Sequence, residues 1–343
     1  MNVLVTGAAG YIGSHAADRL LRDGHTVVAV DNLSRGHRAA VDLLAAGAGP
    51  GKFTFVRADL GDRASLEDAM RAHKVEAIMH FAAFALVGES VEQPLVYYRN
   101  NVAGMVSLLE AAVSAGVPRF VFSSSCATYG QPPDTMVPIP EDCPKSPLSP
   151  YGWSKLHGEH ILRDVAEGCR RTGKPFGYAA LRYFNVAGAD ARGRLGEDHE
   201  PETHIIPVVI QAVLGLRPHV AIFGTDYPTP DGTCVRDYIH VEDLADAHVT
   251  CMNALKPGDE RQYNLGIGRG YSVREIIDAV RAVTGREFKV IEQARRAGDP
   301  PRLYADARKI KAELGWSASR TDLHEIIRSA WAWYQKNPRG YPK

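Results

Sequence analysis

The sequence has no net charge, because 40 basic and 40 acidic side chains balance each other. There is therefore no overall positive field to hold nucleic acid or an anionic membrane, and an anionic ligand must be bound by local groups. No apolar run approaches the about 20 residues that a membrane span needs. The apolar segment 205–216, for example, is interrupted by Pro207, Gln211 and Gly215. We expect no nucleic-acid partner and no membrane segment.

The sequence also has few cysteines. The five that are present are an odd number, widely separated, and contain no C-x-x-C pair, which argues against a disulfide framework and a zinc finger. The first apolar run already begins at residue 3, so we expect no secretory signal ahead of the first structural element. We therefore expect a cytoplasmic protein whose thiols stay reduced.

The order of apolar runs predicts an α/β fold. Six short runs recur in the first half, at 3–5, 27–30, 53–56, 77–79, 120–122 and 179–181, and the stretches between them are long enough for helices. This alternation is typical of a Rossmann-type, doubly wound parallel sheet. Apolar residues at helical spacing follow the first run, and Gly24 would end that helix.

A second long helix is predicted from about residue 91 to 115, with Gly116 as its terminator. Its apolar stripe consists of Val102, Met105, Val106, Leu109 and Val113.

A length of 343 residues suggests about two domains. We expect a first domain at 1–187 and a smaller α/β domain at 188–343, with segments near 236–265 returning to the first. In the second half, helices are predicted near 207–214, 241–255, 272–284 and 322–335, with a strand near 262–265.

The first strand runs directly into a glycine-rich turn, GAAGYIG at 7–13, and then into a helix. Gly7 would allow the sharp turn, Gly10 the approach of a pyrophosphate, and Gly13 the close packing of helix on strand. The N–H groups at the start of the helix favour an anion. We expect the turn, Tyr11 and Ile12 included, to bind a dinucleotide; the alternative is a tight loop in a plain α/β domain.

The second strand ends at Asp31 and Asn32, where a carboxylate would accept hydrogen bonds from the adenosine ribose. This favours NAD over NADP, although Arg35 and Arg38 keep an NADP alternative open. Asp59 and Leu60, after the third strand, are candidate contacts for the adenine.

The chemistry is predicted after the fifth strand, which ends in Ser123, Ser124 and Ser125. Tyr151 and Lys155 are one helical turn apart, so both side chains project on the same face. A neighbouring ammonium favours the phenolate and makes Tyr151 a usable general base. Ser125 can hydrogen-bond an alcohol or carbonyl oxygen while the tyrosine moves the proton, as hydride transfer requires. The alternative is a solvated helix face.

With these motifs, the chain resembles the UDP-glucose 4-epimerase (UDP-galactose 4-epimerase) family of the extended short-chain dehydrogenase/reductase superfamily over nearly its whole length. Further motifs carry this resemblance: HFAA at 80–83, VGES at 87–90, YYRNN at 97–101, LRYFN at 181–185, GED at 196–198, IFGTDYPTPDGT at 222–233, VRDYIHV at 235–241 and YNLG at 263–266.

The resemblance implies reversible epimerisation at C4 of UDP-galactose and UDP-glucose through a 4-keto sugar, with tightly held NAD recycled in place. It also implies a homodimer formed through long helices at 91–115 and 154–169. The implied cofactor contacts, beyond those above, are Phe81, Ala82, Ala83, Asn100, Ser123, Tyr151, Lys155 and Phe184. The implied substrate contacts are Ser125, Tyr151, Asn185, His204, Ile205, Ala221, Phe223, Arg236, Arg296, Asp299 and Leu303.

Within this set, Asn185, Arg236 and Arg296 would bind the diphosphate, because guanidinium and amide groups offer planar donors to phosphate oxygens. The uridine would lie between Phe223 and the 204–205 region. The alternatives are surface pairs of Arg236 with Asp237 or Glu242, and of Arg296 with Asp299.

Three positions vary from the family pattern. Ala85 replaces a lysine found near the cofactor in some members, and Cys126 follows the catalytic serine where others have alanine. Cys126 is interpreted as a small core residue and not a nucleophile. Leu303, intermediate in size, lies where the family sets the width of the sugar pocket, and predicts weak or no use of UDP-N-acetylglucosamine.

Two other functions are considered. A nucleotide-sugar dehydratase or reductase shares the fold, but a dehydratase needs an Asp-Glu pair where this chain has Cys126 and Ala127. A non-catalytic protein on the same fold would have little reason to keep Ser125, Tyr151 and Lys155 together. The histidines show no spacing typical of a metal site, and we expect no metal.

Overall fold

The computed structural model describes residues 1–296 and 299–342. These divide into two compact units. The first unit contains Met1–Gly130, Pro144–Arg182 and Ala245–Tyr263, and the second contains Gln131–Cys143, Tyr183–Leu244 and the chain from Asn264 onward.

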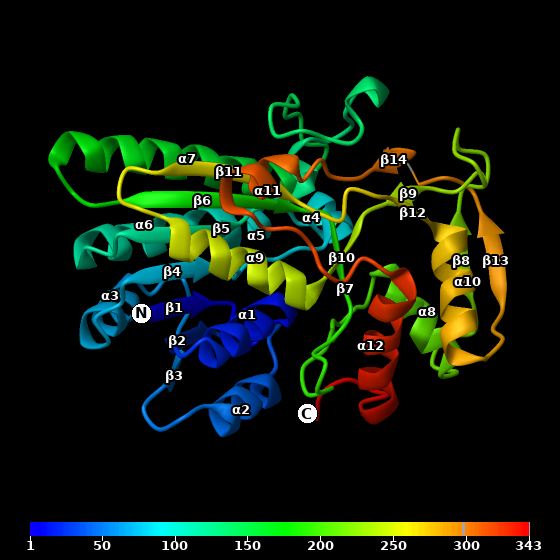
Figure 1. Cartoon of the computed structure of the whole chain (residues 1–343), viewed down its shortest axis with the longest axis horizontal. Helices are drawn as coiled ribbons and strands as arrows, with labels where there is room; N and C mark the ends of the chain where they lie inside the picture. The colour runs from blue at the N-terminus through cyan, green and yellow to red at the C-terminus, as the bar shows by residue number, and fades with distance from the viewer. Residues whose placement is uncertain (297–298, 343) are drawn as a thin grey trace. The chain divides into compact units, whose positions relative to one another are not determined.

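The first unit is built on a seven-stranded sheet with the order β11-β6-β5-β4-β1-β2-β3 (Figure 1). Its strands are β1 (Asn2–Thr6), β2 (Thr26–Asp31), β3 (Phe53–Arg57), β4 (Ala77–His80), β5 (Arg119–Ser123), β6 (Gly177–Tyr183) and β11 (Glu260–Leu265). The pairs from β3 through β6 are all parallel. The predicted Rossmann-type sheet is confirmed, and the strand predicted near 262–265 belongs to this sheet, at its edge beside β6.

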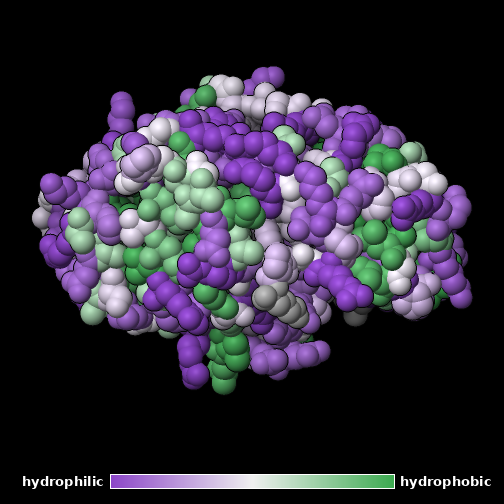
Figure 2. Space-filling model, turned by 90° about the horizontal axis from the view of Figure 1, so that it is seen from below, coloured by the Kyte–Doolittle hydropathy of each residue, from purple (hydrophilic) through white to green (hydrophobic). Residues whose placement is uncertain are grey.

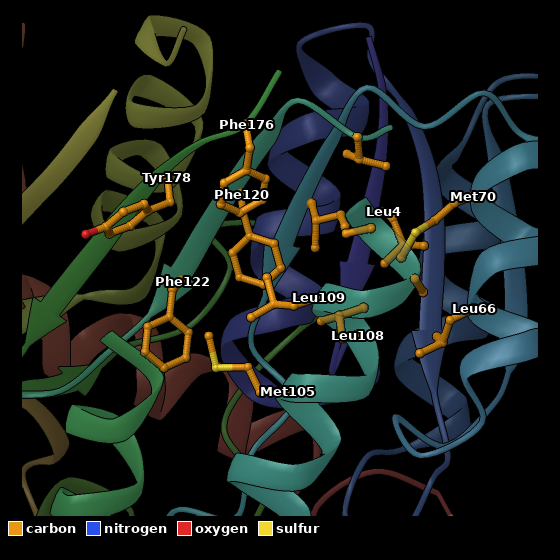
Figure 3. Packing of buried hydrophobic residues seen from close by; sticks show 14 of the residues in the cluster. Leu4, Leu66, Met70, Met105, Leu108, Leu109, Phe120, Phe122, Phe176 and Tyr178 are labelled. Atoms are coloured by element: carbon orange, nitrogen blue, oxygen red, sulfur yellow. The ribbon is translucent and has the colours of Figure 1, made fainter. Parts of the chain in front are cut away.

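Helices lie on both faces of this sheet (Figure 1). They are α1 (Tyr11–Arg22), α2 (Arg38–Gly47), α3 (Arg63–Ala72), α6 (Gly104–Ala115), α7 (Pro150–Thr172) and most of α9 (Val241–Ala254). Because side chains alternate along a strand, Leu4, Phe120 and Tyr178 point to one face and there meet apolar residues of α3, α6 and α7 (Figure 3). Each fully buried apolar side chain of this core contributes about 1.5–3 kcal/mol.

The prediction of a single long helix at 91–115 is wrong. The chain forms α4 (Val87–Glu92), α5 (Pro94–Tyr97), a π-helix (Tyr98–Ala103) and then α6. Gln93 leaves the helical region because it precedes Pro94. The π turn then shifts the helical register, so Val106 is 39% exposed while Met105 is buried. The predicted terminator is confirmed, since Gly116 has φ of +75°.

The second unit carries the other helices that the sequence predicts. Its helices are α8 (Ile205–Val213), α10 (Val273–Thr284), α11 (Arg308–Leu314) and α12 (Leu323–Lys336). Ser272 and Glu275 form a capping box that fixes the start of α10. Three small sheets complete this unit: β8 (Val220–Phe223) with β13 (Val290–Gln293), β7 (Asn185–Ala187) with β10 (Tyr238–His240), and β9 (Val235–Arg236) between β12 (Tyr271–Ser272) and β14 (Arg302–Leu303).

Within the described ranges, no helix combines the length and the apolar character needed to cross a membrane. On the face shown in Figure 2, hydrophilic residues are interspersed with separate groups of hydrophobic ones.

Candidate active site

The glycine-rich turn between β1 and α1 has no room for side chains at two positions. Gly7 has φ of +71°, and a Cβ there would lie 2.6 Å from the backbone nitrogen of Ala82. A Cβ on Gly13 would lie 2.1 Å from the carbonyl oxygen of Gly7, which is closer than atoms can approach. Gly10 is less crowded, with 3.3 Å between such a Cβ and the same oxygen. The turn therefore brings α1 against β1 as closely as a dinucleotide-binding turn requires.

The N-terminus of α1 fits an anionic group. Its N-cap is Gly10, which has no side chain to accept the N–H groups of the first turn, and that turn contains no acidic residue. The partial positive charge of the helix end and these N–H groups suit a pyrophosphate.

Asp31 lies at the end of β2, beside the turn, and is 9% exposed. Its carboxylate accepts hydrogen bonds from the N–H groups of Ala9, at 3.0 Å, and Leu33, at 2.8 Å. Burial raises the pKa of Asp31, and the two backbone donors partly oppose that rise. The carboxylate is thus held rigidly, with lone pairs left for a ribose hydroxyl.

The ends of β2 and β3 are tied together near the expected adenine site. Asn32 donates from Nδ2 to Asp59 at 2.7 Å, and Asp59 also accepts from the N–H of Gly61 at 2.8 Å. Leu60 is buried in the core, against Gly104 of α6. The positively charged candidates for NADP are engaged elsewhere: Arg35 pairs with Glu89, and Arg38 with Asp42.

The remaining expected cofactor contacts in the first unit lie after β4 and in the π-helix. The ring of Phe81 lies 4.7 Å from that of His248, and Ala82 lies against the glycine turn. Ala83 follows them and is partly exposed. Asn100, in the π-helix, donates to Asn101 at 2.9 Å. Such π turns are frequent at functional sites.

Lys155 is fully buried on α7 and donates from Nζ to the carbonyl oxygen of Ser123, at 2.8 Å. Its Nζ lies 5.9 Å from the centre of the Tyr151 ring, so the predicted juxtaposition of the two side chains is present. Burial lowers the pKa of Lys155 to about 7. Tyr151 itself is 8% exposed, at the first turn of α7.

Ser125 follows β5 and caps a short 3₁₀ turn, accepting the N–H of Ala127 on its Oγ at 3.1 Å. The start of α7 packs directly on this turn, because a Cβ on Gly152 would lie 2.6 Å from the carbonyl oxygen of Ala127. The segments that carry Ser125, Tyr151 and Lys155 are therefore packed together within the first unit. Cys126, also in this turn, is partly exposed.

The sequence reasoning missed a buried network behind these residues. Glu159, one turn beyond Lys155 on α7, accepts the hydroxyl of Ser124 at 2.6 Å and two guanidinium nitrogens of Arg182 at 2.7 Å each. Arg182 also donates to the hydroxyl of Tyr129, at 2.9 Å. The spacing 151, 155, 159 on one helix face was the only indication in the sequence.

In the second unit, strand β9 places Arg236 beside Leu303 of β14, its partner in the sheet register. The guanidinium of Arg236 forms an ion pair with Asp299. Neither surface partner considered from the sequence is used: Asp237 is buried and accepts three backbone N–H groups, and Glu242 pairs with Arg320. The structure thus brings together Arg236, Asp299 and Leu303, three of the expected substrate contacts.

Phe223 and Arg296 form a second pair in this unit. The guanidinium carbon of Arg296 lies 3.8 Å from the centre of the Phe223 ring, at the end of β8, and Ala221 lies two residues earlier on that strand. The nearby Arg295, which the sequence reasoning did not select, lies 4.3 Å over the ring of Tyr227 and pairs with Asp226.

The other expected contacts of this unit lie at element ends. Phe184 is buried, and Asn185 begins β7, with its N–H donated to the carbonyl of Asp237 at 3.0 Å. His204 is the N-cap of α8 and Ile205 its first residue. Burial lowers the pKa of His204, but the carboxylate of Glu197 more than offsets this and raises it to about 9.

With this geometry described, comparison with known proteins decides the family. The profile of the NAD dependent epimerase/dehydratase family matches residues 3–266. The chain belongs to this family. It is also 46% identical to the UDP-glucose 4-epimerase of Lacticaseibacillus casei, over 99% of both chains.

Two further known proteins are similar over nearly all of this chain. A probable UDP-arabinose 4-epimerase from Oryza sativa subsp. japonica is 46% identical, over 99% of this chain and 84% of its own. The crystal structure of the UDP-glucose 4-epimerase from Stenotrophomonas maltophila, with bound NAD and formylated UDP-arabinopyranose, is 42% identical and has a TM-score of 0.92, with 99% of both chains covered.

The comparisons confirm the expected enzyme class, an NAD-dependent UDP-sugar 4-epimerase. They do not test the individual site residues. The roles of Ser125, Tyr151 and Lys155, and of the substrate contacts in the second unit, stay predictions that rest on the contacts described above.

Proposed function

We propose that this epimerase interconverts UDP-galactose and UDP-glucose with Tyr151 as the group that moves the proton. The observation that carries the assignment is the buried Lys155, which lies on the same face of α7 as Tyr151 and is fixed by the carbonyl of Ser123. Burial of an amine is costly, and an amine beside a tyrosine can control the proton affinity of the phenol.

The residues of the first unit fit NAD. The crowded Gly7 and Gly13, the open helix start at Gly10 and the buried carboxylate of Asp31 would hold the pyrophosphate and the ribose. When bound, NAD supplies the acceptor, and later the donor, of the hydride at C4 of the sugar. The pairing of Arg35 and Arg38 with carboxylates argues against a 2′-phosphate contact.

In this proposal, Tyr151 accepts the proton of the sugar's 4-hydroxyl as the C4 hydride leaves, and returns it to the same oxygen when the hydride comes back to the opposite face of C4. Ser125 donates a hydrogen bond to the same oxygen when it is a carbonyl. Lys155 positions Tyr151 and favours its phenolate when charged. Holding the sugar oxygen with only two hydroxyl groups leaves the ring free to present its other face.

The second unit would bind the UDP part. Arg236, Arg296 and Asn185 would hold the diphosphate, with the uridine near Phe223, Ala221 and the 204–205 pair. Asp299, now paired with Arg236, would orient that guanidinium. Many contacts to UDP and few to the hexose give the binding energy without restraining the ring.

A UDP-pentose is the second candidate substrate, because a 46% identical relative is named as a probable UDP-arabinose 4-epimerase. A pentose lacks the C6 hydroxymethyl group, so a pocket made for a hexose admits it as well. The two substrates are therefore tested together.

The test follows the anomeric proton signals of UDP-galactose by NMR after addition of purified protein and no cofactor. Formation of UDP-glucose to a fixed ratio supports both the reaction and retained NAD. If added NAD is needed, the tight retention is wrong but the reaction stands. No product from UDP-galactose, with rapid turnover of UDP-arabinose, would assign the pentose, and a 4-keto-6-deoxy product would assign a dehydratase.

The proposal includes a cytoplasmic homodimer. The five free cysteines suit a reducing compartment. Apolar side chains exposed on α4, α5 and α7, with Val91 62%, Leu95 76% and Trp153 39% exposed, offer a surface for a second copy. Sedimentation analysis should give a dimer that L95E weakens, and a monomer at all concentrations would contradict it.

A further inference from the structure

Four residues with metal-ligand side chains meet in the second unit, in the segment that leads into α8. Glu197, His199, Glu202 and His204 each offer one ligand atom, and these atoms all lie within 4.8 Å of one another. The Nδ1 of His199 lies 3.5 Å from a carboxylate oxygen of Glu197 and 3.5 Å from one of Glu202. Ligands of one tetrahedral zinc ion are separated by about this distance, given bonds of about 2.0–2.1 Å.

Glu202 gives a second, independent indication. It is 6% exposed, and its Oε2 makes no hydrogen bond. Its other oxygen, Oε1, is fully used by the N–H groups of Thr203 and His204, at 2.7 and 2.8 Å. Arg217 donates to the backbone carbonyl of Glu202 and not to the carboxylate. A polar neighbour of Oε2 is the Nδ1 of His199, at 3.5 Å, which is itself one of the candidate ligands. A buried carboxylate oxygen that lacks a hydrogen bond is costly unless a cation, either a protonated imidazole or a metal ion, lies beside it.

The net charge of the cluster suits a divalent cation. Glu197 is also buried, at 4% exposed, so two carboxylates are removed from water beside two imidazoles. With neutral imidazoles the group carries two negative charges. His204 hydrogen-bonds Glu197, and a metal would replace the proton between them.

We propose that Glu197, His199, Glu202 and His204 form a binding site for a divalent transition metal of the zinc type. Two nitrogen and two oxygen ligands suit Zn²⁺ or Co²⁺ and not Mg²⁺ or Ca²⁺, which prefer oxygen alone. The bound ion fixes the segment 197–204 to the start of α8. This site uses none of Ser125, Tyr151 and Lys155, and it shares only His204 with the residues proposed to contact the uridine.

The test uses the full-length protein, treated with a chelator and then freed of it. Titration with Zn²⁺ by calorimetry should show one tight equivalent, and Co²⁺ should give the strong visible absorption of a tetrahedral site. H199A and E202Q should each weaken Zn²⁺ binding at least about 10-fold, because each loses a ligand. E202Q keeps the size of the side chain, and its circular dichroism spectrum should match that of the wild type.

The matched control is H324A, because His324 also lies 3.5 Å from a carboxylate, that of Asp322, at the start of a helix. It should bind Zn²⁺ as the wild type does. Binding of Zn²⁺ that is equally strong in H199A, E202Q and H324A, or the absence of any stoichiometric binding and of the tetrahedral Co²⁺ spectrum, would overturn the proposal. Neither readout depends on epimerase activity.

Discussion

The two units hold their candidate site residues in different ways. In the first unit, Asp31, Ser125 and Lys155 are buried and bonded to backbone groups close to them. In the second unit, Arg236 is held by an ion pair at a partly exposed position, and Arg296 lies over an aromatic ring at an exposed one. Backbone contacts are fixed by the fold, whereas side-chain pairs can be exchanged for contacts with a ligand. The proposed catalytic side chains are thus held in place by the fold, whereas the proposed substrate contacts can rearrange when a ligand binds.

The largest expected effect tests the first unit's chemistry. Y151F removes the proposed proton acceptor, and we expect a loss of about 10²–10⁴-fold in kcat. Bound NAD, measured after denaturation, should stay at the wild-type level, because the glycine turn is untouched. A loss below about tenfold would mean that another group moves the proton.

G13A should disrupt the cofactor turn, since its Cβ would lie 2.1 Å from the carbonyl oxygen of Gly7. We expect at least about a tenfold loss of retained NAD and a stability loss of about 1–3 kcal/mol. The control is G168A on α7, where no atom lies within 4 Å of the new Cβ, and there a gain of about 0.4–1 kcal/mol is expected. Equal NAD content in both variants would contradict the assignment of the turn.

R236A tests the exchangeable contacts of the second unit. A hydrogen bond from a charged donor to a phosphate contributes about 1.5–3 kcal/mol to binding. Its loss should therefore raise KM for the UDP-sugar by about 10–150-fold, with NAD content unchanged. R274A is the matched control, because Arg274 also pairs with a carboxylate, that of Glu292, at the surface of the same unit. An unchanged KM in R236A would place the diphosphate elsewhere.

Lys155 makes stability depend on pH. Its pKa is about 7 in the folded protein and about 10.4 when unfolded, so between these values the unfolded chain binds more protons. The free energy of unfolding should therefore rise with pH in this window. Relative to K155M, the wild type should gain roughly 1–3 kcal/mol between pH 7 and 9.5 in urea unfolding. A constant difference across this range would mean that the amine is not held neutral.

The smallest effect concerns the sugar pocket. Leu303 should make UDP-N-acetylglucosamine a poor substrate, and L303S should raise its kcat/KM by about tenfold, as expected for removing a few carbon atoms from a pocket. UDP-galactose turnover should change little. Comparable rates for both sugars in the wild type would contradict the role of Leu303.

The parts of the fold that the sequence predicted depend on local patterns. The six apolar runs and the turn from Gly7 to Gly13 follow from strand periodicity and glycine geometry within short windows. The break in the helix at 91–115 was missed because the apolar stripe masked the effect of Pro94 and of the π turn. The pair of Arg236 and Asp299 was missed because its members are 63 residues apart in the chain.

The metal-ligand cluster at 197–204 was also missed because the sequence does not show how its residues meet in the fold. His199 and His204 were judged by their spacing alone, and a spacing of five residues matches no regular helical or strand face. Only the folded path of the segment 197–204 brings them to the two glutamates. Contacts between residues far apart in the sequence, and contacts within irregular loops, cannot be predicted from local sequence patterns.

The buried pair of Glu159 and Arg182 has a consequence for redesign. Glu159 lies on α7 with the proposed catalytic residues Tyr151 and Lys155, so this helix cannot turn or slide without leaving a buried charge unpaired. Removing one partner would cost about 3–5 kcal/mol, whereas replacing both with apolar side chains of similar volume costs far less. Substrate preference can therefore be altered freely in the second unit, but any change at these two positions must be made in both at once.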